Sequence, residues 1–227
     1  MKFYIVTLGE GGDECAMAVA ANSEGDVPGK VFEQHGAGKI SNIRETTMES
    51  FAALNGYENL PPLSGNALKF AKVRPDAKIP TRDDENAGYD IYACFDEPEI
   101  EIAPHSTRLI PTGIAAALSN DYYLQVHERG STGVKGMKYS AGVIDASYRG
   151  EIFIALSNVN DHYIVITKSD RPDPERYPDA VAYPYSKAIA QLVVHEVHKM
   201  DIEEISYEEL LCIPSGRGTG ALGSSGK

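Results

Sequence analysis

The sequence has few cysteines, and none of them forms a motif. Cys15, Cys94 and Cys212 are far apart and odd in number, with no Cys-x-x-Cys pair and no histidine spacing suited to zinc. Cysteines in this pattern predict neither a disulfide framework nor a zinc site. We therefore expect reduced thiols and a cytoplasmic location.

Long apolar runs and positive charge are also scarce. No stretch approaches the ~20 apolar residues that span a bilayer, so we expect no membrane insertion. Residues 1–6 are too short for a signal peptide. The formal net charge is −12, which argues against a nucleic-acid partner, because that affinity rests largely on Lys and Arg neutralising phosphates. A small anion would need its own local cluster of donors.

What is present is the composition of an ordinary globular protein. The 227 residues are 42% hydrophobic and 24% charged, enough for one full domain with a sizeable core and a small second module. Residues 1–60 predict a small α/β module of unassigned role. Its expected strands are 2–8, 15–21 and 40–44. One expected helix is capped at Ser23 and runs to about Gln34, and a second begins at Thr46. Residues 61–66 read as a linker.

From Asn66 onward, short apolar runs are interrupted about every 8 to 12 residues by Pro, Gly, Asn or Asp, which predicts a mainly β sandwich or barrel. One helical turn is expected at 206–211. Residues 168–186 hold four prolines and three tyrosines, and we expect an inserted loop that acts as a lid or as a contact surface for a protein partner. The expected strands are 68–73, 89–94, 100–102, 107–110, 113–117, 122–127, 142–144, 151–158, 163–166 and 189–198.

The stretch 142–151 organises the functional interpretation. Val143 and Ile144 run into Asp145, and a short turn leads to a second apolar run at 152–156, which predicts a β-hairpin. A carboxylate at the end of such a strand can point into a cleft, while free backbone groups of the turn read the edge of a flat polar ligand. The alternative is that Asp145 stabilises its own turn through an Asx hydrogen bond.

Four further polar segments interrupt the strand pattern. In the first, Gly88 lets the backbone turn before Asp90. The segment that begins at Arg129 combines a cation, two hydroxyls and two glycines and can wrap an anion, although a hairpin loop with a solvated arginine fits it equally. The last segment reads as a flexible tail whose donors can order over a polyphosphate. The four are 87–90, 129–133, 188–191 and 216–227.

These five segments, in this order, resemble the homotrimeric dUTPase (deoxyuridine 5'-triphosphate nucleotidohydrolase) family. The resemblance covers about residues 66–227 and leaves the N-terminal module unexplained. It implies a jelly-roll, or β-clip, domain that assembles as a homotrimer with shared active sites and hydrolyses dUTP to dUMP and pyrophosphate with Mg²⁺. By that analogy one chain supplies 87–90, 129–132 and Gln191, a second supplies 142–150, and a third supplies the tail.

The resemblance also implies roles for individual residues. Asp145 would be the general base that activates water for attack on the α-phosphorus. Asp90 would hold Mg²⁺ through water, and Tyr148 would pack under the deoxyribose and reject UTP. The substrate-binding set implied for the uracil edge, the phosphates and the closing tail is Gly142, Val143 and Ile144; Arg129, Gly130, Ser131, Thr132 and Gln191; and Arg217, Leu222, Gly223, Ser224 and Ser225.

Two positions depart from the family pattern. Leu222 stands where the family tail usually carries an aromatic residue that stacks on uracil, so we expect weaker closure. Gly130 stands where the family commonly has Ser, so Ser131 is expected to carry the hydroxyl contact.

Two other functions remain open. One is dCTP deaminase, which shares the fold, but its catalytic Glu would fall near Ala155, and no carboxylate follows Glu151 in that strand. The other is a dUTP-responsive regulatory protein that binds a partner through 1–60 or 168–186.

Overall fold

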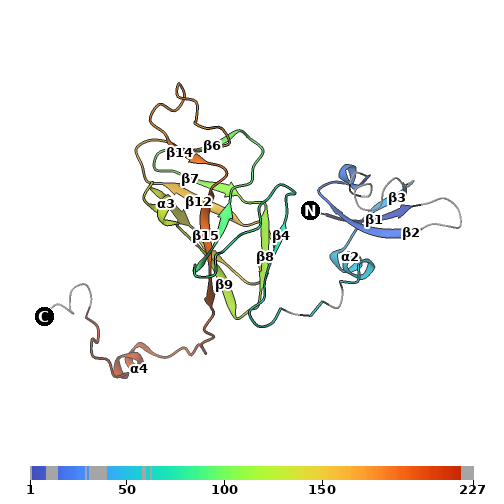
Figure 1. Cartoon of the computed structure of the whole chain (residues 1–227). Helices are drawn as coiled ribbons and strands as arrows, with labels where there is room; N and C mark the ends of the chain where they lie inside the picture. The colour runs from blue at the N-terminus through green and yellow to red at the C-terminus, as the bar shows by residue number, and fades with distance from the viewer. Residues whose placement is uncertain are drawn as a thin grey trace. The chain divides into compact units, whose positions relative to one another are not determined.

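The computed structural model describes residues 2–8, 15–28, 30, 40–57, 60–61 and 63–220. It divides into two compact units, Met1–Pro62 and Leu63–Lys227, each of which is considered separately below. Figure 1 shows the elements of both units.

The first unit is a three-stranded antiparallel sheet with one helix. Strand β1 (Lys2–Leu8) pairs with β2 (Cys15–Ala21) on one side and β3 (Ile40–Thr46) on the other. A 3-10 turn, η2, covers Glu24–Asp26, and helix α2 covers Met48–Leu54. These elements confirm the predicted small α/β module. Of the helix expected to reach Gln34, Val27, Pro28 and Lys30 are helical, and residues 29 and 31–34 lie outside the described residues.

The start of α2 differs by one position from the prediction. Thr46 belongs to β3, and Thr47 caps the helix by accepting a hydrogen bond from the Ser50 backbone N–H at 3.3 Å. Either threonine has the hydroxyl that a cap requires, so sequence alone does not separate them. Tyr4, Val6 and Val19 form the buried centre of the unit.

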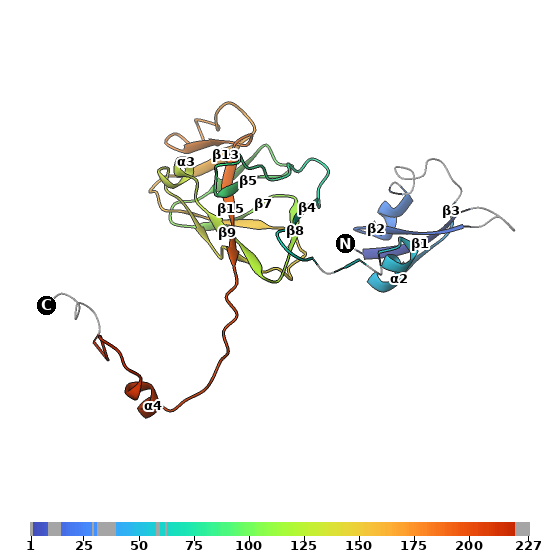
Figure 2. The same ribbon diagram turned by 60° about the horizontal axis from the view of Figure 1, so that its bottom comes forward.

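The second unit is mainly β, as predicted. Its strands form four sheets, ordered β10-β12-β7, β11-β9-β15-β5, β14-β13-β6 and β4-β8, and Figure 2 shows them from a second direction. Two short helices, α3 (Gly130–Gly133) and α4 (Tyr207–Cys212), accompany them. The strands are β4 (Leu68–Lys72), β5 (Gly88–Tyr92), β6 (Glu99–Ile102), β7 (Thr107–Pro111), β8 (Ile114–Leu118), β9 (Tyr122–His127), β10 (Met137–Ser140), β11 (Val143–Ile144), β12 (Phe153–Asn158), β13 (Ile164–Thr167), β14 (Val181–Pro184) and β15 (Ala188–Glu196).

One apolar core joins these sheets. Ile91, Leu124, Ile154, Ile164 and Leu192 come from five strands and are fully buried in one cluster. Burying each large apolar side chain between facing sheets contributes roughly 1.5–3 kcal/mol to the free energy of folding. The core therefore fixes the strands whose outward residues form the candidate site.

The predicted hairpin around Asp145 is wrong in its pairing. Strand β11 pairs with β9, whereas β12 pairs with β10 and β7, so the two strands belong to different sheets. The chain between them crosses from one sheet to the other. Glu151 fastens the end of this crossing, because its Oε1 accepts hydrogen bonds from the backbone N–H groups of Thr112 (3.1 Å) and Gly113 (2.7 Å).

The segment 168–186 is more ordered than expected. Its final residues form β14, which pairs in parallel with β13, and the rings of Tyr177 and Tyr183 are buried. Arg176 pairs with Glu101 at 2.9 Å, which ties the preceding loop to β6. The loop is thus shorter than 168–186, and its use as a contact surface stays a prediction.

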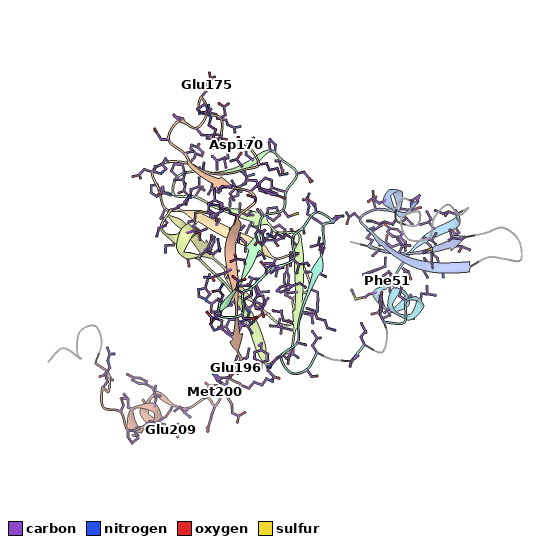
Figure 3. The ribbon with its side chains drawn as sticks, viewed as in Figure 1. Phe51, Asp170, Glu175, Glu196, Met200 and Glu209 are labelled. Atoms are coloured by element: carbon purple, nitrogen blue, oxygen red, sulfur yellow. The ribbon has the colours of Figure 1, made fainter. Side chains whose placement is uncertain are left out.

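The C-terminal segment follows β15. Glu196 is the last residue of β15, and Met200 and Glu209 lie beyond it (Figure 3). Among the described residues, no hydrogen bond or ion pair joins residues 201–220 to the sheets. In the same described part of the chain, no helix is long and apolar enough to cross a membrane.

Candidate active site

Three neighbouring strands bring polar side chains into one row. In the registers of β5, β15 and β9, Gln191 lies opposite Asp90 on one side and opposite His127 on the other. All three side chains are partly buried, in strands whose alternate residues face the core. Residues far apart in sequence therefore become neighbours on one face of the sheet, because side chains alternate along each strand.

Arg129 faces this row from the end of β9. Its Nε donates a hydrogen bond to Asp90 Oδ1 at 2.8 Å, and each side chain is about one-third exposed (31% and 30%). Burial lowers the pKa of the guanidinium, but the charge and hydrogen bond of Asp90 outweigh it and raise that pKa above its ordinary value. The Nη1 group makes longer hydrogen bonds to Ser131 Oγ (3.5 Å) and the Ala188 carbonyl (3.4 Å).

Helix α3 holds the backbone of Arg129. The Thr132 side chain is fully buried, and its Oγ1 accepts from the Arg129 N–H and donates to the Arg129 carbonyl, both at 3.0 Å. This hydroxyl is engaged within the chain and therefore positions Arg129. Gly130 and Ser131, by contrast, are exposed and line the adjoining cavity.

Gly88 is required by a close approach rather than by a turn. It is the first residue of β5, and a Cβ built there would meet Gln191 Oε1 at 2.4 Å. The Gln191 amide is held in that place, since its Nε2 donates to the Glu128 carbonyl at 2.7 Å. Gln191 is thus fixed on both sides, and only glycine fits beneath it.

These side chains surround a cavity of about 440 Å³, the substrate cavity. Its walls include two residues that belong to none of the five polar segments, Asp83 and Asn86. They lie in a turn closed by a hydrogen bond from the Asn86 N–H to the Asp83 carbonyl at 2.9 Å. Their sequence signal was a polar run directly before Ala87. The full lining is Asp83, Asn86, Ala87, Gly88, Asp90, Arg129, Gly130, Ser131 and Gln191.

The carboxylates of this cavity fit a Mg²⁺ ion whose other ligands are water and phosphate oxygens. Among the described residues, no group of three or more His, Cys, Asp or Glu side chains can enclose a metal ion. The cavity does hold two carboxylates, those of Asp83 and Asp90. One or two carboxylates suit Mg²⁺ when waters and substrate phosphates supply the other ligands.

The Asp145 turn forms a second group of candidate residues. Its backbone is closed by a hydrogen bond from the Tyr148 N–H to the Asp145 carbonyl at 3.0 Å. Asp145 is exposed, and its carboxylate has no hydrogen bond or ion pair with any residue that the structure describes. The Asx alternative is therefore not the arrangement found, and the carboxylate is free to meet solvent or a ligand.

Neighbours of Asp145 are held by the same turn. The Tyr148 hydroxyl donates to the Glu151 carbonyl at 2.9 Å, and its ring covers Gly150, where an added Cβ would meet Tyr148 Oη at 2.4 Å. The Gly142 carbonyl accepts from the Val126 N–H at 2.8 Å. Val143 is 60% exposed, whereas Ile144 packs against the core.

Within one chain the structure does not bring all predicted site residues together. Neither Asp145 nor Tyr148 lines the substrate cavity. Arg217 is exposed and its Nε donates to the Gly220 carbonyl within its own turn, at 2.7 Å. The predicted tail residues Leu222, Gly223, Ser224 and Ser225 lie outside the described residues.

Comparison with known proteins gives a consistent result. A model of the dUTPase family matches residues 76–171. The chain is 35% identical over 166 residues to the deoxyuridine 5'-triphosphate nucleotidohydrolase of Candida albicans, covering 72% of this chain and 91% of that protein. It is 34% identical over 168 residues to the same-named protein of Mycobacterium sp. strain JLS, covering 70% and 96%.

Solved structures with a similar fold point the same way. The dUTPase of Staphylococcus bacteriophage 80alpha with dUpNHpp aligns with a TM-score of 0.56 at 22% identity, covering 72% of this chain and all of that chain (100%). A dUTPase from phage phi11 of S. aureus aligns with a TM-score of 0.51 at 20% identity, covering 63% and 99%. These similarities confirm the predicted fold.

Proposed function

The chain belongs to the dUTPase family, and on that premise we propose that it is a dUTP diphosphatase that hydrolyses dUTP to dUMP and pyrophosphate. The observation that carries the proposal is the substrate cavity, where Arg129, Asp90 and Gln191 converge from separate strands and loops. A cation, an amide and a hydroxyl around one polar cavity suit a polyphosphate.

Phosphate binding falls to the arginine and its neighbours. The Arg129 Nε is occupied by Asp90, and its Nη1 bonds are long, so the guanidinium retains donors for an incoming phosphate oxygen. Ser131 adds a hydroxyl on the same wall. We assign the α- and β-phosphates to Arg129, Ser131 and Gln191, because charge-assisted hydrogen bonds are the strong ones in such a site.

Asp90 is the residue that would hold Mg²⁺, through water, with Asp83 nearby. A phi11 phage dUTPase of similar fold has been described with a structural Mg(II) ion. When bound, Mg²⁺ neutralises charge that develops on the phosphates. Asp90 then has two roles, since the same carboxylate orients Arg129.

Asp145 is the proposed general base. Its carboxylate is exposed and unpartnered within the described residues, so it can accept a proton from a water that attacks the α-phosphorus. Tyr148 would pack under the deoxyribose and leave no room for a 2′-hydroxyl. The backbone of residues 142–144 would hydrogen-bond the uracil edge and disfavour a base with an amino group at position 4.

A complete site then requires more than one chain. The Asp145 turn is not part of the substrate cavity of its own chain, so we assign it to the cavity of a second chain in a homotrimer. The third chain supplies Arg217, Leu222, Gly223, Ser224 and Ser225 as a lid that excludes water from the phosphates. A closed cyclic trimer lets every chain give and receive the same parts.

The experiment that tests this proposal is a nucleotide panel. With Mg²⁺ present, full-length protein should release pyrophosphate from dUTP at least about 100-fold faster than from dTTP, dCTP or UTP. A chain that ends at Gly216 should retain the fold and lose most of this activity, because it lacks the lid. Pyrophosphate release is followed by a coupled colorimetric assay, and folding by the thermal midpoint.

The same panel separates the deaminase alternative. Ammonia release from dCTP would support that function and contradict the proposal. The structure gives no support to it: Ala155 is buried in β12, and the nearest carboxylate in sequence, Glu151, is occupied by the backbone of Thr112 and Gly113.

A further inference from the structure

A second cavity adjoins the substrate cavity. It has a volume of about 410 Å³ and shares Asp90, Arg129 and Ser131 with the substrate cavity, so the Arg129–Asp90 pair lines both cavities. We refer to it as the lysine cavity. Its lining is Lys78, Asp90, Tyr92, Arg129, Ser131, Lys135, Tyr183, Ser186, Lys187 and Ala188.

The charge of the lysine cavity is opposite to that of the chain. Four of its side chains are cationic, and Asp90 is its one carboxylate, whereas the whole chain carries a formal net charge of −12. Asp90 is already paired with Arg129. A concentration of positive charge in a concave wall attracts small anions and raises their local concentration.

Two of the lysines are held over aromatic rings of the same wall. Lys78 Nζ lies 3.6 Å from the centroid of the Tyr92 ring, and Lys135 Nζ lies 5.5 Å from that of Tyr183. Ammonium groups in this position are attracted by the face of the ring. The lysines are therefore placed in advance, and they cover the ring faces that a nucleobase would need.

Lys187 is placed by the turn between β14 and β15. Its N–H donates to the Pro184 carbonyl at 3.1 Å, and the Tyr183 hydroxyl donates to the Ala188 carbonyl at 2.6 Å. The turn is thus fastened at both ends. Because Lys187 is exposed, its ammonium can move toward an anion in the cavity without breaking an ion pair among the described residues.

We propose that the lysine cavity binds the pyrophosphate product. This rests on the proposed function, in which water attack at the α-phosphorus breaks the bond to the β-phosphate and releases pyrophosphate beside Arg129. The same arginine lines the lysine cavity. Lys78, Lys135 and Lys187 bind the pyrophosphate anion while dUMP remains in the substrate cavity. The lysine cavity is then the path by which pyrophosphate leaves.

The test is calorimetric titration of full-length protein with inorganic pyrophosphate, without nucleotide. The Lys78→Ala/Lys187→Ala double variant should bind pyrophosphate at least about tenfold more weakly than wild type. Lys69→Ala removes the same charge from an exposed site on β4 that lines neither cavity, and it should bind as wild type does. Affinity for dUMP should be equal in all three proteins.

Equal pyrophosphate affinity in the double variant and wild type would overturn the proposal, as would a wild type that binds no pyrophosphate. Thermal midpoints confirm folding, and Lys187→Gln, which keeps part of the side-chain stem and removes the charge, serves as a second variant that should also bind pyrophosphate more weakly than wild type. dUTP turnover is measured separately. Lysine-dependent pyrophosphate binding without dUTP turnover would contradict the proposed function alone, whereas turnover without lysine dependence would contradict the lysine cavity alone.

Discussion

Asp145→Asn is expected to lower kcat for dUTP hydrolysis by about 10³-fold, within the range attributed to a positioned general base. The amide has nearly the shape of the carboxylate but cannot accept the proton of the attacking water. Because Asp145 makes no side-chain hydrogen bond or ion pair within the described chain, stability should change little. Single-turnover rates with Mg²⁺ measure the chemical step, and titration with a non-hydrolysable analogue measures binding.

Asp161→Asn is the matched control. Asp161 is also an exposed aspartate after a strand, its partner is His105 at 2.9 Å, and neither residue lines the substrate cavity or the lysine cavity. It should hydrolyse dUTP at the wild-type rate. If Asp145→Asn kept full activity, the assignment of the base would be wrong. If the wild type and Asp145→Asn bound dUTP equally well and neither hydrolysed it, the protein would be a regulatory binding protein.

The second large effect is expected at Arg129. Arg129→Met should lower kcat/KM for dUTP by about 10² to 10³-fold, the loss typical when one charge-stabilising donor is removed from an active site. The methionine stem retains part of the packing but offers no donor to phosphate. The change also leaves the carboxylate of Asp90 without its partner. Both the KM for dUTP and the Mg²⁺ concentration needed for half-maximal activity should therefore rise.

Arg176→Met controls for the loss of one arginine. Arg176 is paired with Glu101 through its Nη2 at 2.9 Å and lies on the loop before β14. Steady-state kinetics of this variant should match wild type. Equal kinetics for Arg129→Met and Arg176→Met would remove the phosphate assignment, provided that both variants keep the wild-type thermal midpoint.

The strands were more predictable than their partners. β9 occupies the range expected from its pattern, 122–127, because alternate residues face the core. Two strands, β10 and β14, were missed. β14 ends at Pro184 in a proline-rich segment, whose composition predicts a loop. It is a strand because it pairs on one side with β13, and the local sequence does not show that pairing. The hairpin at Asp145 failed for the same reason, since adjacent apolar runs do not reveal which strands pair.

The site was predictable where segments carried a recognisable pattern. Asp90, Arg129 and Gln191 were expected together from a resemblance, and the structure places them around one cavity; their catalytic roles stay predictions. The reason for Gly88 required the structure, because only the fold brings Gln191 over it. The lysines of the lysine cavity had no sequence signal, since they come from positions 78, 135 and 187, which are far apart in the chain.

We propose that each site combines Arg129 of one chain with Asp145 of another, and mixing the two inactive variants should therefore restore activity. Asp145→Asn and Arg129→Met chains are co-expressed in equal amounts with different affinity tags, and dUTP hydrolysis is measured on the mixture. Random assembly of a cyclic oligomer places an intact arginine beside an intact aspartate in about a quarter of the sites. Recovery of about that fraction of wild-type activity is expected; a mixture of confirmed hetero-oligomers that stays as inactive as its parents would show that the site is not shared in this way.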